Sequence, residues 1–241
     1  MIDTHCHLLP QLDDGPANDR AALTLASGLA ASGVAFVLCT PHYSSRFPTD
    51  HLEALRREAA LVRLLESEGV DLEIAVAAEV SPERAVAADP DELRTRSIAG
   101  RFVIVELLPD TPVVSLATIS FTLAKLDLLP IFAHPERCRA LARGFAPLDD
   151  VRRDGALIQV VATSLTGRWG AEIHATAWRL VDTGRADLIG SDAHHGRHGT
   201  VLRRAAELVE DRLGENTKRE LTELRPKLII SGTHPDTASR R

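Results

Sequence analysis

Hydrophobic and polar positions alternate along the chain with two different periods. Short apolar or β-branched runs, typical of buried strands, occupy residues 1–6, 34–40, 72–78, 102–107, 129–133, 156–162 and 186–191. Longer segments with helical periodicity lie between them, at residues 18–32, 50–68, 114–127, 169–184 and 199–213. Asn18 and Thr49 are candidate N-caps of the first two helices. Strands this apolar, alternating with helices, indicate a parallel sheet covered by helices.

The number and character of these units predict the fold class. Seven strand-helix units without a glycine-rich phosphate loop favour an α/β fold of the β/α barrel type over an open doubly wound sheet. The chain has 241 residues, close to the ~250 residues typical of one such barrel. We therefore expect a single barrel domain over residues 1–231, followed by a polar C-terminal tail over residues 232–241.

Composition narrows the possible partners and compartment. The formal net charge is −6 and no basic block is present, which argues against nucleic-acid binding through a cationic face. Cys6, Cys39 and Cys138 are too few for a disulfide framework and indicate a reducing compartment. The chain lacks a secretory signal pattern and any apolar run of the ~20 residues that a membrane span requires. We expect a cytoplasmic protein without membrane insertion.

Histidines and carboxylates stand at or just after the ends of six of the seven predicted strands. In chain order they are His5, His7, His42, Glu79, Glu106, His134, Asp192 and His194. One such residue alone is commonly a solvated loop residue or a helix cap. All strands of a parallel barrel open onto one face, however, so these side chains are expected to converge. Only the strand at 156–162 supplies no obvious candidate. The pattern predicts a metal centre.

The spacing of these residues supports metal binding. In His5-Cys6-His7 the two histidines occupy positions i and i+2, so both imidazoles point to the same side of a strand. Cys6 then points to the opposite side, into the core. Asp192 and His194 have the same spacing. Imidazole and carboxylate ligands without thiolate suit Zn²⁺, Mn²⁺ or Fe²⁺ rather than a structural zinc site.

Several motifs resemble a known family. They are Met1–Pro10 (MIDTHCHLLP), Leu12–Pro16 (LDDGP), Thr40-Pro41-His42, Ala78-Glu79-Val80, His134-Pro135-Glu136-Arg137 and Ser191-Asp192-Ala193-His194. Together they resemble the bacterial PHP-domain tyrosine-protein phosphatases of the CpsB/CapC type, over residues 1 to about 230. The resemblance implies a distorted seven-stranded β/α barrel of the PHP type, similar to a TIM barrel. It also implies three divalent metal ions, with manganese preferred and iron or zinc as alternatives.

The resemblance further implies which residues hold each ion. The first ion would be held by His5, His7, Glu79 and Asp192. Glu79 would bridge to a second ion, which Glu106 and His134 also bind. The third would be held by Asp14, His42 and His194. The chain departs from the family pattern after His194, where His195-Gly196-Arg197-His198-Gly199 replaces an Asn and a nearby Arg-Pro pair, and in the loop 43–48. Both departures concern the substrate more than the metals.

The implied activity is hydrolysis of a phosphomonoester by a hydroxide that bridges two metal ions and attacks phosphorus. The implied substrate is an autophosphorylated bacterial tyrosine kinase of capsule or exopolysaccharide synthesis, or its phosphotyrosine-bearing C-terminal tail. Arg137 is the first candidate to clamp the phosphate, since a guanidinium binds two oxygens at once. Arg46 and Arg197 are further candidates.

Other polar residues receive supporting or surface assignments. Asp3 is expected to support the His5/His7 end of the first strand as a hydrogen-bond acceptor. Asp13 is interpreted as a turn residue before Gly15-Pro16. Three histidines outside the pattern are predicted to lie on the surface: His51, His174 and His234.

Alternative functions differ in mechanism or substrate. A cysteine-dependent phosphatase needs an arginine six positions after its cysteine, and the residues six after Cys6, Cys39 and Cys138 are Leu12, Ser45 and Gly144. A PHP-type histidinol-phosphate or other small-molecule phosphatase would use the same centre. A TatD-like nuclease is disfavoured because Asp14, His42 and His194 indicate a third ion. An inactive scaffold is disfavoured by the complete ligand set.

Overall fold

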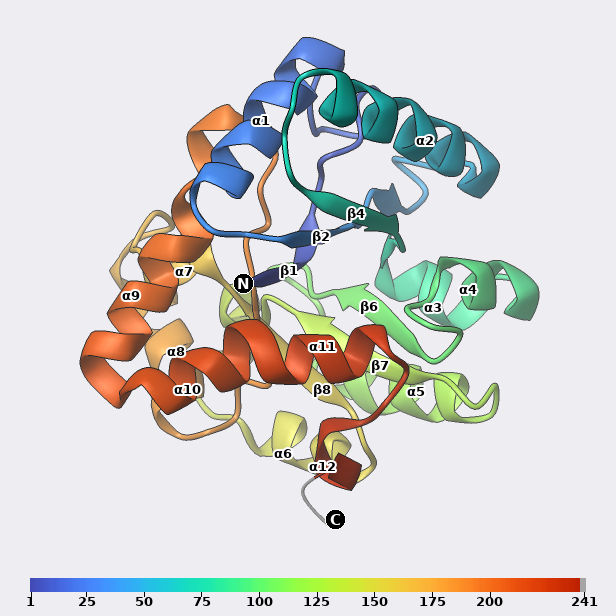
Figure 1. Cartoon of the computed structure of the whole chain (residues 1–241). Coiled ribbons are helices and arrows are strands. Elements are labelled where there is room, and N and C mark those ends of the chain that lie inside the picture. The colour runs from blue at the N-terminus through green and yellow to red at the C-terminus, as the bar shows by residue number, and fades with distance from the viewer. Residues whose placement is uncertain (239–241) are drawn as a thin grey trace.

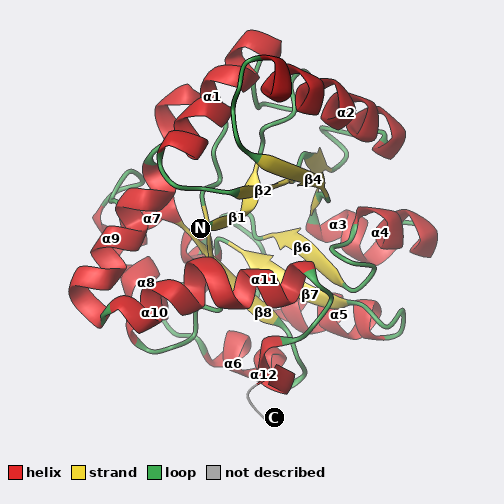
Figure 2. Cartoon of the chain, in the orientation of Figure 1, coloured by secondary structure: helices red, strands yellow, loops and turns green. Residues whose placement is uncertain are grey.

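The computed structural model describes residues 1–238 and shows parallel strands surrounded by helices (Figures 1 and 2). The smaller sheet has the order β1 (Ile2–Cys6), β2 (Phe36–Cys39), β4 (Glu73–Val76). The larger has the order β3 (His42–Tyr43), β5 (Glu79–Val80), β6 (Phe102–Glu106), β7 (Leu129–Ala133), β8 (Leu157–Val161), β9 (Leu188–Gly190). Every pairing between these strands is parallel, which confirms the predicted α/β class.

The expected seven strands correspond to nine segments in the described part of the chain, because two strands are interrupted. β2 and β3 are separated by Thr40-Pro41, and β4 and β5 by Ala77-Ala78. Proline has no N–H to contribute to a ladder. After the second break, Glu79 does not end the predicted strand 72–78. It belongs to β5 in the larger sheet, where it pairs with Ile104.

Hydrogen bonds connect the two sheets, although no closed barrel is detected among residues 1–238. The N–H of Ala77 donates to the carbonyl of Cys39 at 2.9 Å, and that of Glu79 to Pro41 at 3.2 Å. On the other side, the N–H of His7 donates to Ala193 at 2.9 Å. The end of β1 is thus joined to the segment that follows β9.

Five longer helices match those that periodicity predicted. They are α1 (Asp19–Ala31), α2 (His51–Ser67), α5 (Val114–Ala124), α8 (Ala171–Asp182) and α9 (Val201–Leu213). Asn18 caps α1 as predicted, accepting the N–H of Ala21 at 3.0 Å. Thr49 was the wrong cap for α2. The Asp50 carboxylate accepts the N–H of Glu53 at 2.9 Å instead, as one of the strongest N-cap residue types.

Shorter helices complete the connections, and periodicity did not predict them because each is only one or two turns long. They are α3 (Pro82–Ala87), α4 (Pro90–Arg96), α6 (Ala146–Arg153), α7 (Ala162–Leu165), α10 (Glu215–Arg219), α11 (Arg225–Ile230) and α12 (Pro235–Ala238). Among residues 1–238, three 3-10 turns occur, at Pro135–Arg137, Arg139–Leu141 and Gly196–His198. A π-helical segment, Glu220–Leu224, joins α10 to α11.

Alternate strand residues divide the core into two layers. One cluster combines buried side chains from both sheets, including Leu38, Ala77, Ile104, Ile131, Leu157 and Leu188. Ile229 of α11 packs against this cluster, and Figure 1 shows α11 crossing in front of the strands. The other cluster, with Val37, Val105 and Phe132, packs against the surrounding helices. The two clusters thus place apolar side chains on both faces of the strands, whereas buried polar side chains within strands, such as Asp3, Thr4 and Gln159, are few.

The start of the predicted polar tail packs against the protein. His234 is 7% exposed, lies 3.2 Å through Nε2 from the carbonyl of Gly155, and has its ring 6.2 Å from that of Phe102. Its predicted surface position was wrong, because residues 232–238 turn back onto the core. His51 and His174 are partly exposed. Residues 239–241 of the predicted tail lie outside the described residues. Within residues 1–238 no helix is both long and apolar enough to cross a membrane.

Candidate metal centre

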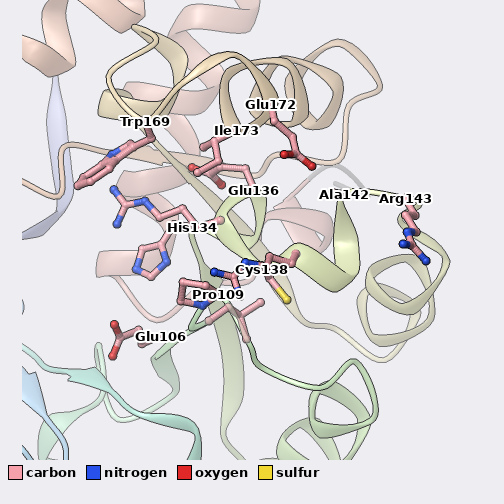
Figure 3. A pocket seen from close by; sticks show the side chains of 13 residues that line it. Glu106, Pro109, His134, Glu136, Cys138, Ala142, Arg143, Trp169, Glu172 and Ile173 are labelled. Carbon is pink, nitrogen blue, oxygen red and sulfur yellow. The ribbon is translucent and has the colours of Figure 1, made fainter.

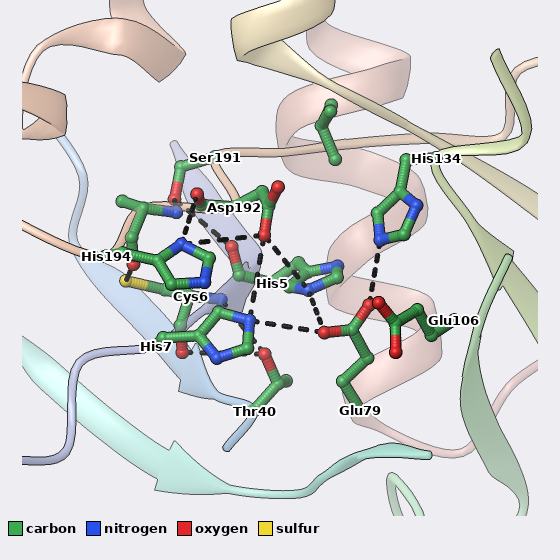
Figure 4. A network of polar contacts seen from close by, with 12 residues as sticks. His5, Cys6, His7, Thr40, Glu79, Glu106, His134, Ser191, Asp192 and His194 are labelled. Carbon is green, nitrogen blue, oxygen red and sulfur yellow. Dashed lines mark hydrogen bonds and ion pairs between the residues drawn. The ribbon is translucent and has the colours of Figure 1, made fainter. Parts of the chain in front are cut away.

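The nine predicted ligands, scattered through the sequence, come together at the carboxyl ends of the strands. Figure 4 shows seven of them pointing toward one another: His5, His7, Glu79, Glu106, His134, Asp192 and His194. Their ligand atoms form four groups, in each of which all atoms lie within 4.8 Å of one another. The groups are His5–His7–Asp192, His5–Glu79–His134, His42–Glu79–Glu106 and His7–Asp14–His42–His194.

At the centre of this arrangement, three buried ligand atoms face one another without a hydrogen-bond partner. They are Nε2 of His5, Nε2 of His7 and Oε2 of Glu79. The Glu79 oxygen lies 3.3 Å from the first nitrogen and 3.2 Å from the second. Buried polar atoms are nearly always satisfied, so unpaired atoms that converge need a shared partner. A divalent cation fits these two nitrogens and this oxygen.

The opposite ring nitrogens of both histidines have hydrogen-bond partners that orient the rings. Nδ1 of His5 lies 2.7 Å from Oε1 of Gln159, and Nδ1 of His7 lies 2.6 Å from Oδ2 of Asp13. Both partners are acceptors, so each Nδ1 carries the proton and each Nε2 presents its lone pair to the centre. Partners of this kind are a regular feature of metal-bound histidines.

Two sequence interpretations are corrected by these contacts. The sixth predicted strand, β8, does contribute to the site through Gln159, whose Nε2 donates to Thr4 Oγ1 at 2.8 Å. Its isolated polar side chain in the apolar run Leu157–Val161 was the available signal. Asp13 is more than a turn residue, because it also accepts the backbone N–H of His42 at 2.9 Å. The hydrogen bonds to His7 and His42 hold the pKa of Asp13 at about 2, although burial opposes this.

Asp3 supports the end of β1 through the backbone and not through the imidazoles. Its Oδ1 accepts the N–H of His5 at 3.2 Å and that of Ser191 at 2.9 Å. Burial raises the pKa of Asp3 to about 6. The carboxyl group thus joins β1 to the segment that carries Asp192.

Charge is concentrated at the centre. Burial opposes ionisation of Glu79, but the imidazoles of His5, His134 and His7 close to its carboxylate hold its pKa well below the usual value. Burial and the negative charge of Glu79 raise the pKa of Glu106 to about 7. Burial also opposes ionisation of Asp192, yet Arg137 and His5 lower its pKa. Closely spaced carboxylates of this kind are stabilised by cations.

Two of the converging residues have left-handed backbones. The φ angle is 38° at His134 and 52° at Asp192. A residue with a Cβ adopts this conformation at a cost of ~1–3 kcal/mol, and such strain is concentrated at functional sites. His134 directly follows β7 and Asp192 is the second residue after β9, so the turn at each strand end redirects the side chain toward the centre.

A cavity of about 330 Å³ is lined by several of the candidate ligands and by Arg137. Nη2 of Arg137 donates to Oδ2 of Asp192 at 2.7 Å and to Oγ1 of Thr163 at 3.2 Å. Arg168, which sequence reasoning missed, also lines this cavity, as do His195 and His198. The sequence contained no signal for Arg168, because this residue lies in the connection between α7 and α8 and not at the end of a predicted strand.

The other two predicted arginines do not line this cavity. Arg46 lines a neighbouring cavity with Asp14, His42 and Glu106, and its Cζ lies 5.0 Å from the ring centre of Phe47. Arg197 is exposed and is not among the residues that line either cavity. The structure therefore favours Arg137 among the three candidates.

Comparisons with known proteins agree with the resemblance seen in the sequence. The sequence profile described as "Capsular polysaccharide synthesis, CpsB/CapC" matches residues 1–231. Tyrosine-protein phosphatase YwqE of Bacillus subtilis is 26% identical over 236 residues, which cover 97% of this chain and 93% of that protein. CapC of Staphylococcus aureus is 27% identical over 199 residues, covering 80% of this chain and 77% of that protein.

Solved structures share the fold. The chain superposes with a TM-score of 0.85 and 24% identity on a structure from work on YwqE of Bacillus subtilis and CpsB of Streptococcus pneumoniae, described as "unique metal-dependent tyrosine phosphatases". This match covers 97% of the chain and 95% of the other protein. A β-aspartyl dipeptidase from Fervidobacterium islandicum has a TM-score of 0.60 and 16% identity, covering 95% of this chain and 74% of that one.

Proposed function

The chain belongs to the CpsB/CapC family of capsular polysaccharide synthesis, and we propose that it is a metal-dependent protein-tyrosine phosphatase. The Bacillus subtilis relative, which it matches over nearly its full length, bears the name of a tyrosine-protein phosphatase. The observation that carries the proposal is the convergence of His5 Nε2, His7 Nε2 and Glu79 Oε2, buried and without hydrogen-bond partners, beside a cavity that contains Arg137.

The proposed centre holds three divalent ions, with manganese preferred and iron or zinc as alternatives. The assignment is His5, His7, Glu79 and Asp192 for one ion, Glu79, Glu106 and His134 for the second, and Asp14, His42 and His194 for the third. The four groups of ligand atoms support it, since each of the nine residues belongs to at least one group. Ions held there would supply a nucleophilic water near neutral pH and positive charge for the phosphoryl oxygens.

The chain's own residues position the phosphate. Arg137 is held by Asp192 and Thr163 through Nη2, which leaves Nη1 to bind a phosphate oxygen. Arg168 forms no ion pair within residues 1–238 and provides a second positive charge along the same cavity. A tyrosyl leaving group has a pKa of about 10, which makes a strong general acid less necessary.

The proposed substrate is the phosphotyrosine-bearing tail of a bacterial tyrosine kinase that acts in capsule or exopolysaccharide synthesis. The capsular polysaccharide description of the family supports this partner. The proposed location is the cytoplasm. The three cysteines, all free and buried, are consistent with a reducing compartment.

We also infer that residues 1–231 form one domain in which the two sheets are parts of one distorted seven-stranded barrel. The match of the family profile to residues 1–231 supports the domain bounds. The hydrogen bonds from His7 to Ala193 and from Glu79 to Pro41 support the barrel. The first joins the segments that follow β1 and β9, and the second continues the β2/β4 ladder into the β3/β5 ladder beside a shared apolar interior.

The test is phosphate release from a phosphotyrosyl peptide and from histidinol phosphate, measured side by side with Mn²⁺ and after removal of metal with EDTA. We expect metal-dependent turnover that favours the peptide. Preference for histidinol phosphate would contradict the assigned substrate but would leave the proposal of a metal centre intact. Turnover that survives EDTA treatment would contradict the proposed mechanism.

A further inference from the structure

A second cavity, of about 600 Å³, adjoins the one that contains the candidate ligands. The two cavities share Glu106, His134, Arg137 and Trp169 as lining residues. Figure 3 shows Glu106 and His134 at one end of the larger cavity and Ala142 and Arg143 at the other. A molecule whose phosphate lies beside Arg137 could therefore extend into the larger cavity without crossing the protein surface.

The walls of the larger cavity combine apolar and aromatic surface. Leu107, Pro109 and Ile173 line it, and the indole of Trp169, which lies against the guanidinium of Arg137, forms another part of the wall. Polar residues, including Arg139, Arg143 and Glu172, also line it. Its volume falls within the ~300–1,000 Å³ usual for sites that enclose organic ligands. A bare phosphate ion or a small polar alcohol would leave most of this apolar wall in contact with water.

Trp169 is held in place although its side chain is 48% exposed. Its Nε1 donates to Oγ1 of Thr163 at 3.0 Å, and the Cζ atom of Arg137 lies 4.7 Å from its ring centre. Thr163 Oγ1 accepts hydrogen bonds from both Trp169 and Arg137. The indole and the guanidinium are therefore fixed relative to each other, one for an aromatic ring and the other for an anion.

We propose that the larger cavity receives the aromatic ring and adjoining peptide of the substrate, and that Ile173 and Trp169 determine selectivity for aryl phosphate esters. This inference rests on the proposed phosphatase function, and it adds the residues that select the leaving group. The phosphate lies in the smaller cavity beside Arg137. The ester oxygen lies at the boundary between the cavities, and the ring packs against Trp169 and Ile173.

The cavity on the other side of the candidate ligands fits an aromatic ring less well. It measures about 260 Å³, and four of its ten lining residues are Ser44, Ser45, Ser81 and Glu83. Phe47 lines it too, but its ring is already stacked on His42, with ring centres 5.4 Å apart and an interplanar angle of 11°. The larger cavity offers both more volume and more unoccupied apolar surface.

The test introduces bulk at Ile173, which lines only the larger cavity. We expect Ile173→Trp to lower kcat/KM for a phosphotyrosyl peptide by about tenfold or more, since the added side chain competes with the ring. Binding is measured separately, by calorimetry on metal-loaded protein with phenylphosphonate and inorganic phosphate as probes. Phenylphosphonate binding should weaken by a similar factor, while phosphate binding changes less than about twofold.

Two further variants keep the test decisive. Ala175→Trp adds a tryptophan at an exposed position of α8 outside both cavities. The binding of both probes should remain unchanged in this variant. Ile173→Ser removes apolar surface without adding volume. It should weaken the binding of phenylphosphonate and leave the binding of phosphate unchanged. Equal weakening of both probes, or no effect on phenylphosphonate, would overturn the assignment. Failure of the wild-type protein to hydrolyse the peptide would instead count against the proposed function, because the two probes measure the cavity without catalysis.

Discussion

Oδ2 of Asp13 lies 2.6 Å from Nδ1 of His7 and accepts the backbone N–H of His42 at 2.9 Å. One carboxylate oxygen thus orients a candidate ligand that directly follows β1 and fixes the backbone of another on β3. Asp13 itself is not among the predicted ligands. Its contribution is to hold His7, which follows a strand of the smaller sheet, and His42, in a strand of the larger sheet, in one arrangement.

Replacing Asp13 tests this relationship. We expect Asp13→Ala to weaken metal binding about 10–100-fold, the usual effect of removing a hydrogen-bond partner of a metal-bound histidine. Metal affinity is measured by calorimetry with Mn²⁺. Asp150→Ala, which removes an exposed carboxylate of α6, is the matched control and should leave the affinity unchanged. An Asp13 variant with wild-type affinity would show that His7 needs no support.

Gly190 makes a close approach that predicts a loss of stability. A Cβ atom at this position would lie 2.6 Å from Cβ of His5 and 3.2 Å from the side-chain amide of Gln159. We expect Gly190→Ala to lower the free energy of unfolding by about 1–3 kcal/mol, because the site is tightly packed. Chemical denaturation provides the measurement. Gly144→Ala is the control, since nothing lies within 4 Å of its added Cβ, and comparable destabilisation of both variants would contradict the packing argument.

Metal removal should lower the thermal stability of the folded protein. A cation that binds only the folded state stabilises it by about 2.7 kcal/mol at a free concentration of 100 times Kd. We therefore expect EDTA to lower Tm and Mn²⁺ to restore it. Glu79→Gln should abolish most of the shift, because Glu79 belongs to two of the four ligand groups. Glu207→Gln, at an exposed position of α9, should retain it. A Tm insensitive to Mn²⁺ in the wild-type protein would argue against the metal centre.

The arginines provide a test of substrate binding. We expect Arg137→Ala to lower kcat/KM for a phosphotyrosyl peptide by about 10²–10³-fold, as for the loss of a donor to a developing oxyanion. Metal affinity, measured in parallel, should change far less than activity. Arg197→Ala should retain activity within about twofold, since this exposed side chain lines neither cavity. Large losses in the Arg197 variant would instead restore the sequence-based prediction for that residue.

The placement of the metal-binding side chains could be predicted from sequence because local pattern and fold class were enough. Strand ends in a parallel sheet meet on one side, so His5, His42, Glu79, His134 and Asp192 were expected to converge, and they do. The i, i+2 spacing placed His5 and His7 on one side of β1. Asp14 could not be found in this way. It lies on a loop, and only the resemblance to the family identified it.

The supporting contacts could not be predicted. Gln159 lies 154 residues from His5 in sequence, and Asp13 lies beside the site because of the fold of the loop that follows β1. Strand interruption was equally hidden, since the run 72–78 does not indicate that Glu79 joins a different sheet. The capping of α2 by Asp50 in place of Thr49 depended on a choice between adjacent polar residues with similar propensities.

By itself, the sequence determined the succession of strands and helices, the absence of a cysteine-dependent mechanism and the identity of most candidate ligands. These properties follow from periodicity and from residue type, which act over a few neighbouring positions. Only the tertiary structure decided which nitrogen of each histidine faces the centre, which arginine lies beside it and where a large cavity opens. Those properties depend on contacts between segments far apart in the chain, and no local pattern encodes the distances between them.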